Sequence, residues 1–294
     1  MIITNTEKGI LLRWREGGER EEEIISFNDF KPHFFVEKDS RLVKLDGETV
    51  YIKEKYENRN TTAFRMDLSY EQGNFKSLEG KELVKVTWSP CHSKYTKKVK
   101  SYFHNRGDRT YEADVQYHYR YAVDMLDTIP EYNLRKWYWD MEWMQGGEHD
   151  GAITAIVVYD NFDDEYYTLT WQPETGTEKE MLEEFVLMVR EKDPDMLISW
   201  FGWKFDLPKL IERLHANDLD PRLLSPVMEV DGVKWSIKDS SVIVQTKRVE
   251  NYSPIAQPIK GRICVPLDLA FERQWNDAQR GTLPSLSLDY VSES

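Results

Sequence analysis

Two acidic residues lie two positions apart in an otherwise aromatic segment, the WYWDMEW of residues 137–143. In a β-strand, alternate side chains project from one face, so Asp140 and Glu142 point in the same direction, together with Tyr138. Neighbouring carboxylates repel each other and resist burial, and a divalent cation relieves both effects. Their hard oxygen atoms suit Mg²⁺ or Mn²⁺. A strand with one solvent-facing side has the same pattern, so the pair alone is compatible with either interpretation.

A third acidic residue, Asp206, lies in the SWFGWKFDLP of residues 199–208, where a short apolar strand is expected to turn into a helix. An aspartate at this position, two residues before Pro208, also suits a helix N-cap. An acidic side chain at such a corner can instead lean over a neighbouring strand and complete a metal site. Asp206 is therefore the third candidate metal ligand, beside Asp140 and Glu142.

The elements around these carboxylates follow a recognisable order. Strands are expected over residues 136–144, 152–159, 165–171 and 196–200. A helix begins at the capping box of Thr177 and Glu180 and ends before Pro194, and a second helix follows Asp206. Three strands, a helix, a strand and a helix is the order of a ribonuclease-H-like sheet, although other α/β folds begin similarly. Residues 232–262 indicate a β-hairpin insertion with the strand-like segments WSI, VIVQTK and GRICV, the last of which extends to residue 265. Residues 267–274 indicate a short helix.

The first 133 residues have a different pattern. Short strands are expected over residues 9–14, 31–37, 49–56, 62–68 and 81–88, and a helix over 92–103. The mixture predicts a small α+β domain at residues 1–133, before an α/β domain at 134–294. Lys97 and Lys98 share a face of the expected helix with Lys94, which suits phosphate contacts or a plain solvated surface.

The composition narrows the class of protein. The chain has 294 residues, 40% of them hydrophobic, which is ample for a packed core and excludes wholesale disorder. The 39 basic and 52 acidic residues give a net charge of −13, which opposes a general polyanion-coating role but allows a local basic groove. The two cysteines exclude a disulfide scaffold and fit a reducing compartment. No signal peptide or long apolar run is visible, so we expect no membrane association and a cytoplasmic location, in a host cell if the source is viral.

Several segments resemble the family B DNA polymerases, most closely their archaeal and viral branch. WDMEW looks like the first exonuclease motif of that family and FGWKFDLPKL like the second. Further similarity lies in KPHFFVE, TYEADVQYHYRYAVD, GRICVPLDLAF and LPSLSLDYV, in the family's order. The resemblance covers most of the chain and implies an N-terminal domain over residues 1–133 and a 3′–5′ proofreading exonuclease domain over 134–294.

The resemblance also implies a chemistry. Asp140, Glu142 and Asp206 match the family's catalytic metal ligands, which implies hydrolysis of the terminal DNA phosphodiester with two Mg²⁺ or Mn²⁺ ions. Two features depart from the family. Phe201 stands where the second motif has Asn, and the third motif, Tyr-x-x-x-Asp, is absent after the second motif. Tyr159 and Asp163 have its spacing but lie between the first two motifs, so we interpret them as a chance match. We therefore expect a truncated polymerase or one chain of a split polymerase, whose remaining part or C-terminal partner is needed for full activity.

Seven residues are candidate contacts to the expected substrates, a single-stranded 3′ end and primer–template DNA: Phe201, Trp203, Lys204, Lys247, Arg248, Lys97 and Lys98. Core packing is the alternative for Trp203, and a solvated hairpin for Lys247 and Arg248. Two other functions stay open. One is an inactive DNA-binding or subunit-assembly module, and the other is an unrelated ribonuclease-H-like nuclease that acts on RNA.

Overall fold

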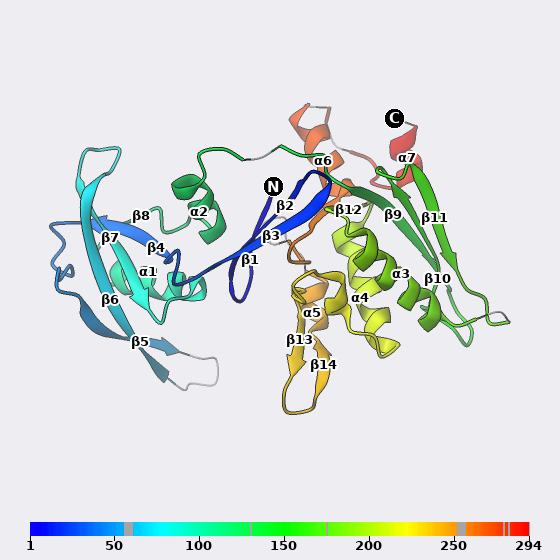
Figure 1. Cartoon of the computed structure of the whole chain (residues 1–294), viewed down its shortest axis with the longest axis horizontal. Helices are drawn as coiled ribbons and strands as arrows, with labels where there is room; N and C mark the ends of the chain where they lie inside the picture. The colour runs from blue at the N-terminus through cyan, green and yellow to red at the C-terminus, as the bar shows by residue number, and fades with distance from the viewer. Residues whose placement is uncertain are drawn as a thin grey trace. The chain divides into compact units, whose positions relative to one another are not determined.

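The computed structural model of the chain (Figure 1) describes residues 1–55, 61–129, 131–174, 176–251, 257–278, 280–281 and 283–293. The chain divides into two compact units. The larger unit comprises residues 1–4, 13–20 and 131–294, and the smaller unit comprises residues 5–12 and 21–130. Tyr56, the last residue of one expected strand, lies outside the described residues. No helix in the described ranges is long and apolar enough to cross a lipid bilayer.

The larger unit contains a five-stranded mixed sheet in the order β11-β10-β9-β12-β15. Its strands are β9 (Lys136–Trp143), β10 (Ile153–Asp160), β11 (Glu165–Thr170), β12 (Met196–Ser199) and β15 (Ile263–Pro266). β10 is antiparallel to β9 and β11, whereas β12 is parallel to β9 and β15. The predicted mixed α/β fold is confirmed. The position of β15 corrects one expectation, because residues 263–265 were assigned to the hairpin insertion and instead form an edge strand of this sheet.

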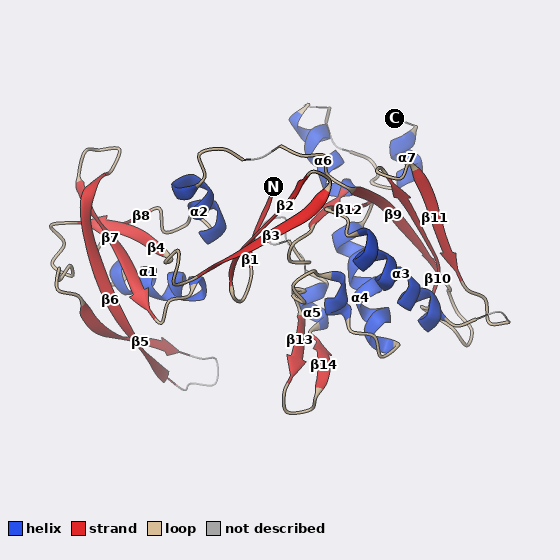
Figure 2. Ribbon diagram, in the orientation of Figure 1, coloured by secondary structure: helices blue, strands red, loops and turns tan. Residues whose placement is uncertain are grey.

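Buried and exposed side chains alternate along β9, so the sheet has a buried face and an exposed face. Trp137, Trp139 and Met141 are buried, whereas the residues between them are exposed. The buried side chains share one core with α3 (Glu178–Lys192) and α4 (Leu207–Ala216), and Trp139 contacts Phe185 of α3 with ring centroids 6.0 Å apart. Both helices therefore cover this buried face of the sheet (Figure 2). The acidic residues of β9 lie on the opposite, exposed face.

Helix α3 begins at the predicted capping box. The Thr177 hydroxyl accepts a hydrogen bond from the backbone N–H of Glu180 at 3.2 Å, and the Glu180 carboxylate accepts one from the N–H of Thr177 at 2.9 Å. Each side chain thus satisfies one of the backbone donors that a helix start leaves without a partner.

Replacing Thr177 by Ala removes one of these two bonds. Because the cap is exposed and the helix body is held by its packed face, we expect the free energy of unfolding to fall by about 1 kcal/mol. Urea unfolding of T177A against the wild type measures the change. Thr177→Ser keeps the hydroxyl, and a loss of the same size in that variant would contradict the capping explanation.

The second half of the larger unit continues from the sheet. A π-helical turn, η2 (Gly202–Asp206), joins β12 to α4, and a 3₁₀ turn, η3 (Pro221–Leu224), follows. The hairpin β13 (Val233–Ser236) and β14 (Ser241–Val244) confirms the predicted insertion, and the short helix α5 (Thr246–Val249) follows it. After β15 come α6 (Leu267–Asp277) and α7 (Leu288–Ser292).

The smaller unit contains an antiparallel sheet in the order β5-β6-β7-β4-β8. Its strands are β4 (His33–Glu37), β5 (Glu48–Lys55), β6 (Thr61–Lys76), β7 (Glu82–Ser89) and β8 (Thr110–Tyr111). Its helical elements are η1 (Ser93–Tyr95), α1 (Thr96–His104) and α2 (Tyr117–Met125). Helix α1 packs Val99, Tyr102 and Phe103 into the core of this sheet, against Phe34 and Trp88 among others.

A small sheet of β1 (Ile2–Asn5), β2 (Gly9–Glu16) and β3 (Glu19–Ser26) has residues in both units. Within the larger unit, its residues 13–20 supply arginines to a buried charge cluster. Arg13 binds the Asp193 carboxylate at 2.7 Å, and Arg20 binds the same carboxylate at 2.7 Å. Arg262 binds the other oxygen of Asp193 at 2.8 Å. The N-terminal segment is thus tied by charge to the end of α3, where Asp193 adopts a left-handed conformation.

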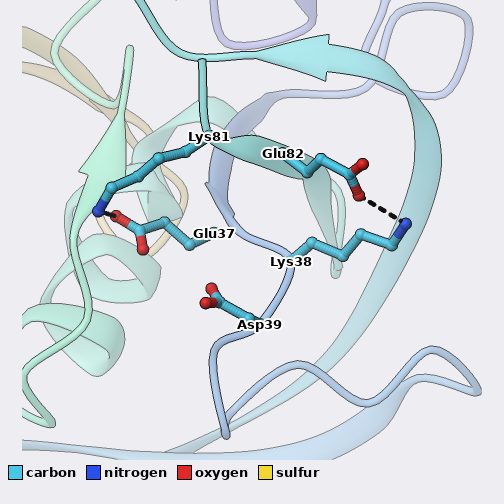
Figure 3. A pocket seen from close by; sticks show the side chains of 5 residues that line it. All are labelled: Glu37, Lys38, Asp39, Lys81 and Glu82. Atoms are coloured by element: carbon cyan, nitrogen blue, oxygen red, sulfur yellow. Dashed lines mark hydrogen bonds and ion pairs between the residues drawn. The ribbon is translucent and has the colours of Figure 1, made fainter. Parts of the chain in front are cut away.

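A hollow of about 490 Å³ in the smaller unit is lined by charged side chains (Figure 3). Lys81 binds Glu37 at 2.6 Å, and Lys38 binds Glu82 at 2.9 Å. Because both lysines are neutralised by a neighbouring carboxylate and Asp39 adds a further negative charge, this hollow does not favour an anionic ligand.

Candidate active site on the exposed face of the central sheet

The strand β9 presents Tyr138, Asp140 and Glu142 on its exposed face. The neighbouring strands continue this face, since Asp140 lies opposite Val157 of β10 and Glu142 lies opposite Ala155. The two carboxylates therefore point away from α3 and α4, in the direction that the alternation predicted. Their position leaves both accessible to a ligand.

Asp206 lies at the end of η2, with 4% of its surface exposed. In this turn the N–H of Asp206 donates to the carbonyl of Phe201, five residues earlier, at 3.3 Å. The Asp206 side chain makes no capping bond to α4, so the alternative interpretation as a helix cap is wrong. The carboxylate instead accepts a hydrogen bond from Ser199 at the end of β12. Single π-helical turns of this kind occur frequently at functional sites.

The electrostatic environment of Asp206 is unfavourable for a carboxylate. Burial, together with the negative charges of Asp140 and Asp268, raises its pKa to about 6 against the opposing effect of the Ser199 hydrogen bond. The oxygen Oδ2 of Asp206 is buried and has no hydrogen-bond partner within the described residues. A buried oxygen without a partner beside further carboxylates is the environment that a bound cation would stabilise.

The structure brings two of the three predicted ligands into electrostatic contact. Asp140 acts on the pKa of Asp206, and Glu142 lies on the same face of β9 one pleat away. In the described part of the chain, no group of three or more His, Cys, Asp or Glu side chains is close enough together to hold a metal ion. Asp140 and Glu142 thus share a face of the sheet, but together with Asp206 they do not form a complete coordination site.

An aromatic hollow of about 580 Å³ adjoins the carboxylates. Its lining includes Tyr138, Asp140, Tyr159, Tyr166, Ser199 and Trp200. The three tyrosines lie directly opposite one another on β9, β10 and β11. The ring centroids of Tyr138 and Tyr159 are 6.1 Å apart, and those of Tyr159 and Tyr166 are 5.0 Å apart. Exposed aromatic rings in this arrangement can stack on unpaired bases.

The candidate DNA contacts in the second motif differ in their exposure and in their partners. Trp203 is 5% exposed and belongs to the core, so its prediction as a DNA contact is wrong. Its large ring is buried because η2 turns it toward the core shared with α4. Phe201 is partly exposed at the start of the turn. Lys204 is about half exposed, and its ammonium group binds Asp268 at 2.7 Å.

The remaining basic candidates lie elsewhere. Lys247 and Arg248 were predicted to lie in the hairpin. They lie instead in α5, which begins shortly after β14 ends. Arg248 binds Asp231 at 3.1 Å, which neutralises part of its charge. In the smaller unit, Lys97 is exposed on α1, and the Lys98 ammonium lies 3.6 Å from the centre of the Phe64 ring.

Asp268 is a further acidic residue of this region that was not among the sequence-based candidates. It is fully buried in the first turn of α6, and its N–H donates to the carbonyl of Trp200 at 3.0 Å. One feature of the sequence could have indicated Asp268. An aspartate directly after a short apolar strand, as in ICVPLD, stands at the carboxyl end of β15, beside the end of β12 that leads to Asp206.

Comparison with known proteins shows which family the larger unit resembles. The sequence model of the family described as "DNA polymerase family B, exonuclease domain" matches residues 145–263. Residues 145–263 are thus similar to the exonuclease domain of the family B DNA polymerases. The matched span of the exonuclease domain includes Asp206 and begins after Glu142.

Archaeal DNA polymerases are among the proteins to which this chain is similar. The DNA polymerase of Thermococcus gorgonarius is 30% identical over 194 residues, which are 63% of this chain and 22% of the relative. That of Thermococcus aggregans is 33% identical over 113 residues, which are 35% of this chain and 6% of the relative. The chain thus spans less than a quarter of the length of these relatives.

A solved structure shows the same fold. The family B DNA polymerase from the hyperthermophilic archaeon Pyrobaculum calidifontis superposes with a TM-score of 0.55 and 16% sequence identity. The superposition covers 92% of this chain and 36% of that chain. The similarity extends beyond the matched exonuclease residues, which confirms the predicted resemblance to a family B polymerase.

Proposed function

We propose that this chain is the N-terminal and exonuclease portion of a family B DNA polymerase and removes nucleotides from a DNA 3′ end. Residues 1–133 are proposed to form the N-terminal domain, and residues 134–294 the exonuclease domain. Asp140, Glu142 and Asp206 are proposed to form the catalytic site. The observation that carries this proposal is the buried Asp206 oxygen that has no partner in the described residues and lies within the electrostatic influence of Asp140.

The donor set suits Mg²⁺ or Mn²⁺. All three side chains offer carboxylate oxygens, and two of them already repel each other electrostatically. Exonuclease domains of this family act with divalent metal ions. A divalent ion bound here would lower the pKa of a water molecule and neutralise charge on the phosphate. The chain itself would hold that ion through the three carboxylates, with Asp206 fixed by Ser199 and the other two fixed by the pleat of β9.

The aromatic hollow supports an unpaired DNA strand as substrate. The tyrosine row begins one pleat from Asp140, so bases next to the scissile phosphate could stack on its rings. Phe201, which is partly exposed at the start of η2, is the candidate DNA contact that we retain in the second motif. We propose Lys97, Lys98, Lys247 and Arg248 as weaker contacts to primer–template DNA.

We further propose that another polymerase segment or chain is needed for full activity. The chain spans 22% of the length of the Thermococcus gorgonarius polymerase, and its described residues contain no complete metal-binding group. A further carboxylate brought by the remaining polymerase part would complete the coordination. The same observation favours the second candidate function, an inactive DNA-binding or assembly module that lacks a full ligand set.

Degradation of a 5′-labelled single-stranded DNA in the presence of Mn²⁺ tests the proposal. We expect stepwise shortening from the 3′ end that is lost in the double variant Asp140→Ala/Glu142→Ala, because it removes two of the three ligands. Glu183→Ala/Glu184→Ala is the matched control, since it removes the same charge from the exposed face of α3 and should leave the rate unchanged.

The other outcomes separate the alternatives. Binding of the DNA without shortening would overturn the nuclease assignment for this chain and support the binding module. Shortening that persists in the Asp140/Glu142 double variant would overturn the site assignment. A strand with ribose at its 3′ end, degraded faster than its deoxyribose counterpart, would instead indicate a nuclease that acts on RNA.

A further inference from the structure

An ion pair links the turn that carries Asp206 to the start of another helix. The Lys204 ammonium group, in η2, lies 2.7 Å from Oδ2 of Asp268 in α6. Asp268 is fully buried, whereas the Lys204 side chain is about half exposed. Breaking such a pair on the lysine side would leave a buried carboxylate without its counter-charge, which is costly.

Backbone contacts join the same two elements. The carbonyl of Trp200 accepts the N–H of Asp268 at 3.0 Å, and the Trp200 ring contacts Phe271 of α6 with centroids 6.1 Å apart. Gly202 packs closely against the end of β12, because a Cβ there would come within 2.7 Å of the Ser199 hydroxyl oxygen, and its other near neighbour is Pro266 at the end of β15. The turn η2 is therefore held against the junction of β15 and α6.

The Asp206 side chain has few contacts of its own. It accepts one hydrogen bond, from Ser199, and its second oxygen has no partner in the described residues. Its position relative to β9 must therefore come from the backbone of η2. Lys204 is the residue of that turn that has a side-chain ion pair across to α6.

We propose that Lys204 and Asp268 act as a positioning pair that holds the π-helical turn so that Asp206 faces the carboxylates of β9. Lys204 then serves the reaction through Asp206 and not as a contact to DNA. This inference rests on the proposed function, because it concerns the position of Asp206, one of the three proposed metal ligands. It explains why a half-exposed lysine is paired with a buried aspartate at this point of the fold.

The test compares Lys204→Met with Lys204→Arg. Removing a residue that orients a metal ligand typically costs about 10–100-fold in activity or metal affinity. We therefore expect Lys204→Met to lower kcat on single-stranded DNA with Mn²⁺ by about 10–100-fold at an unchanged KM, and to weaken Mn²⁺ binding. Lys204→Arg keeps the positive charge and should restore most of the activity. Lys192→Met is the matched control, since it removes a lysine–aspartate pair of 2.6 Å in the same unit and should leave kcat unchanged.

Three results would overturn the proposal. A raised KM with unchanged kcat in Lys204→Met would make Lys204 a DNA contact. Loss of Mn²⁺ binding in Asp268→Asn but not in Lys204→Met would make Asp268 a metal ligand. Equal kcat in Lys204→Met and Lys192→Met would leave the pair without a positioning role.

Failure of the proposed function has a different signature. If the wild type neither binds Mn²⁺ nor shortens DNA, the nuclease proposal fails. Amide hydrogen exchange then tests separately whether the Lys204–Asp268 pair anchors the turn. Faster exchange of the amides of residues 204–206 in Lys204→Met than in Lys192→Met supports the anchoring of the turn, and equal exchange overturns it.

Discussion

Replacing Arg262 by Met should lower the free energy of unfolding of the larger unit by about 3–5 kcal/mol, the usual cost of breaking a buried ion pair on one side. Arg262 is 2% exposed. Its guanidinium group donates to the carbonyl of Leu224 at 2.8 Å, to that of Pro194, and to the Asp193 carboxylate at 2.8 Å. Met fills a similar volume but satisfies none of these acceptors.

The same cluster makes stability depend on pH. Burial alone would raise the pKa of Asp193, but the charges of Arg262, Arg13 and Arg20 outweigh this effect and hold the pKa well below its usual range. A carboxyl group whose pKa is lowered in the folded state stabilises that state above the unfolded pKa, near 4, and loses this contribution as the pH falls below it. In Arg262→Met, the difference from the wild type should therefore shrink at acid pH.

Urea unfolding followed by tryptophan fluorescence measures both effects. Trp88 is the single tryptophan of the smaller unit, so the signal reports almost entirely on the larger one. Arg222→Met is the matched control, because Arg222 pairs with Asp220 two residues away, at the partly exposed start of η3. We expect a loss of about 1 kcal/mol or less there. A loss of similar size in both variants would contradict a special role of the buried cluster.

Replacing Asp206 by Asn should stabilise the metal-free chain by about 2–3 kcal/mol near pH 8 and abolish the proposed hydrolysis of DNA. The pKa of Asp206 is raised from 3.8 to about 6, and each unit of such a shift corresponds to about 1.4 kcal/mol. A carboxyl group with a raised pKa favours the folded state below the unfolded pKa, and this contribution is lost as the pH rises through about 6. Asn carries no charge and avoids that loss.

The measurement is the free energy of unfolding of Asp206→Asn and wild type at pH 4 and pH 8. The two proteins should be similar at pH 4 and differ at pH 8. Added Mn²⁺ should stabilise the wild type and not the variant, because binding to the folded state alone adds stability. Asp218→Asn, in the exposed turn after α4, is the control and should change stability by about 0.5 kcal/mol or less. A destabilised Asp206→Asn at pH 8 would show that the buried carboxylate is already compensated.

Local patterns in the sequence predicted much of the framework of the larger unit. The alternation of residues 137–143 placed Asp140 and Glu142 together on the exposed face of a strand. The capping box at Thr177 located the start of α3, and the order of elements predicted the mixed α/β fold. These features depend on residues that are near neighbours in the chain, and their periodicity alone shows which face is buried.

Other features were decided by contacts between distant residues. Trp203 was a candidate DNA contact until the turn of η2 buried it, and residues 263–265 became a sheet strand by pairing with β12. The same pairing places Asp268 beside the turn of Asp206, although 64 residues separate Asp268 from Lys204. No local pattern specifies such a neighbour.

The sequence by itself thus determined the types of the candidate ligands, the face on which Asp140 and Glu142 lie, and the resemblance to the family B DNA polymerases. The tertiary structure alone decided that Asp206 is buried without a capping role, that its pKa is raised, and that Lys204 faces Asp268. The physical reason is that burial and charge–charge interactions depend on distances through space. These distances are set only when β12 and β15 pair and bring the ends of both strands together.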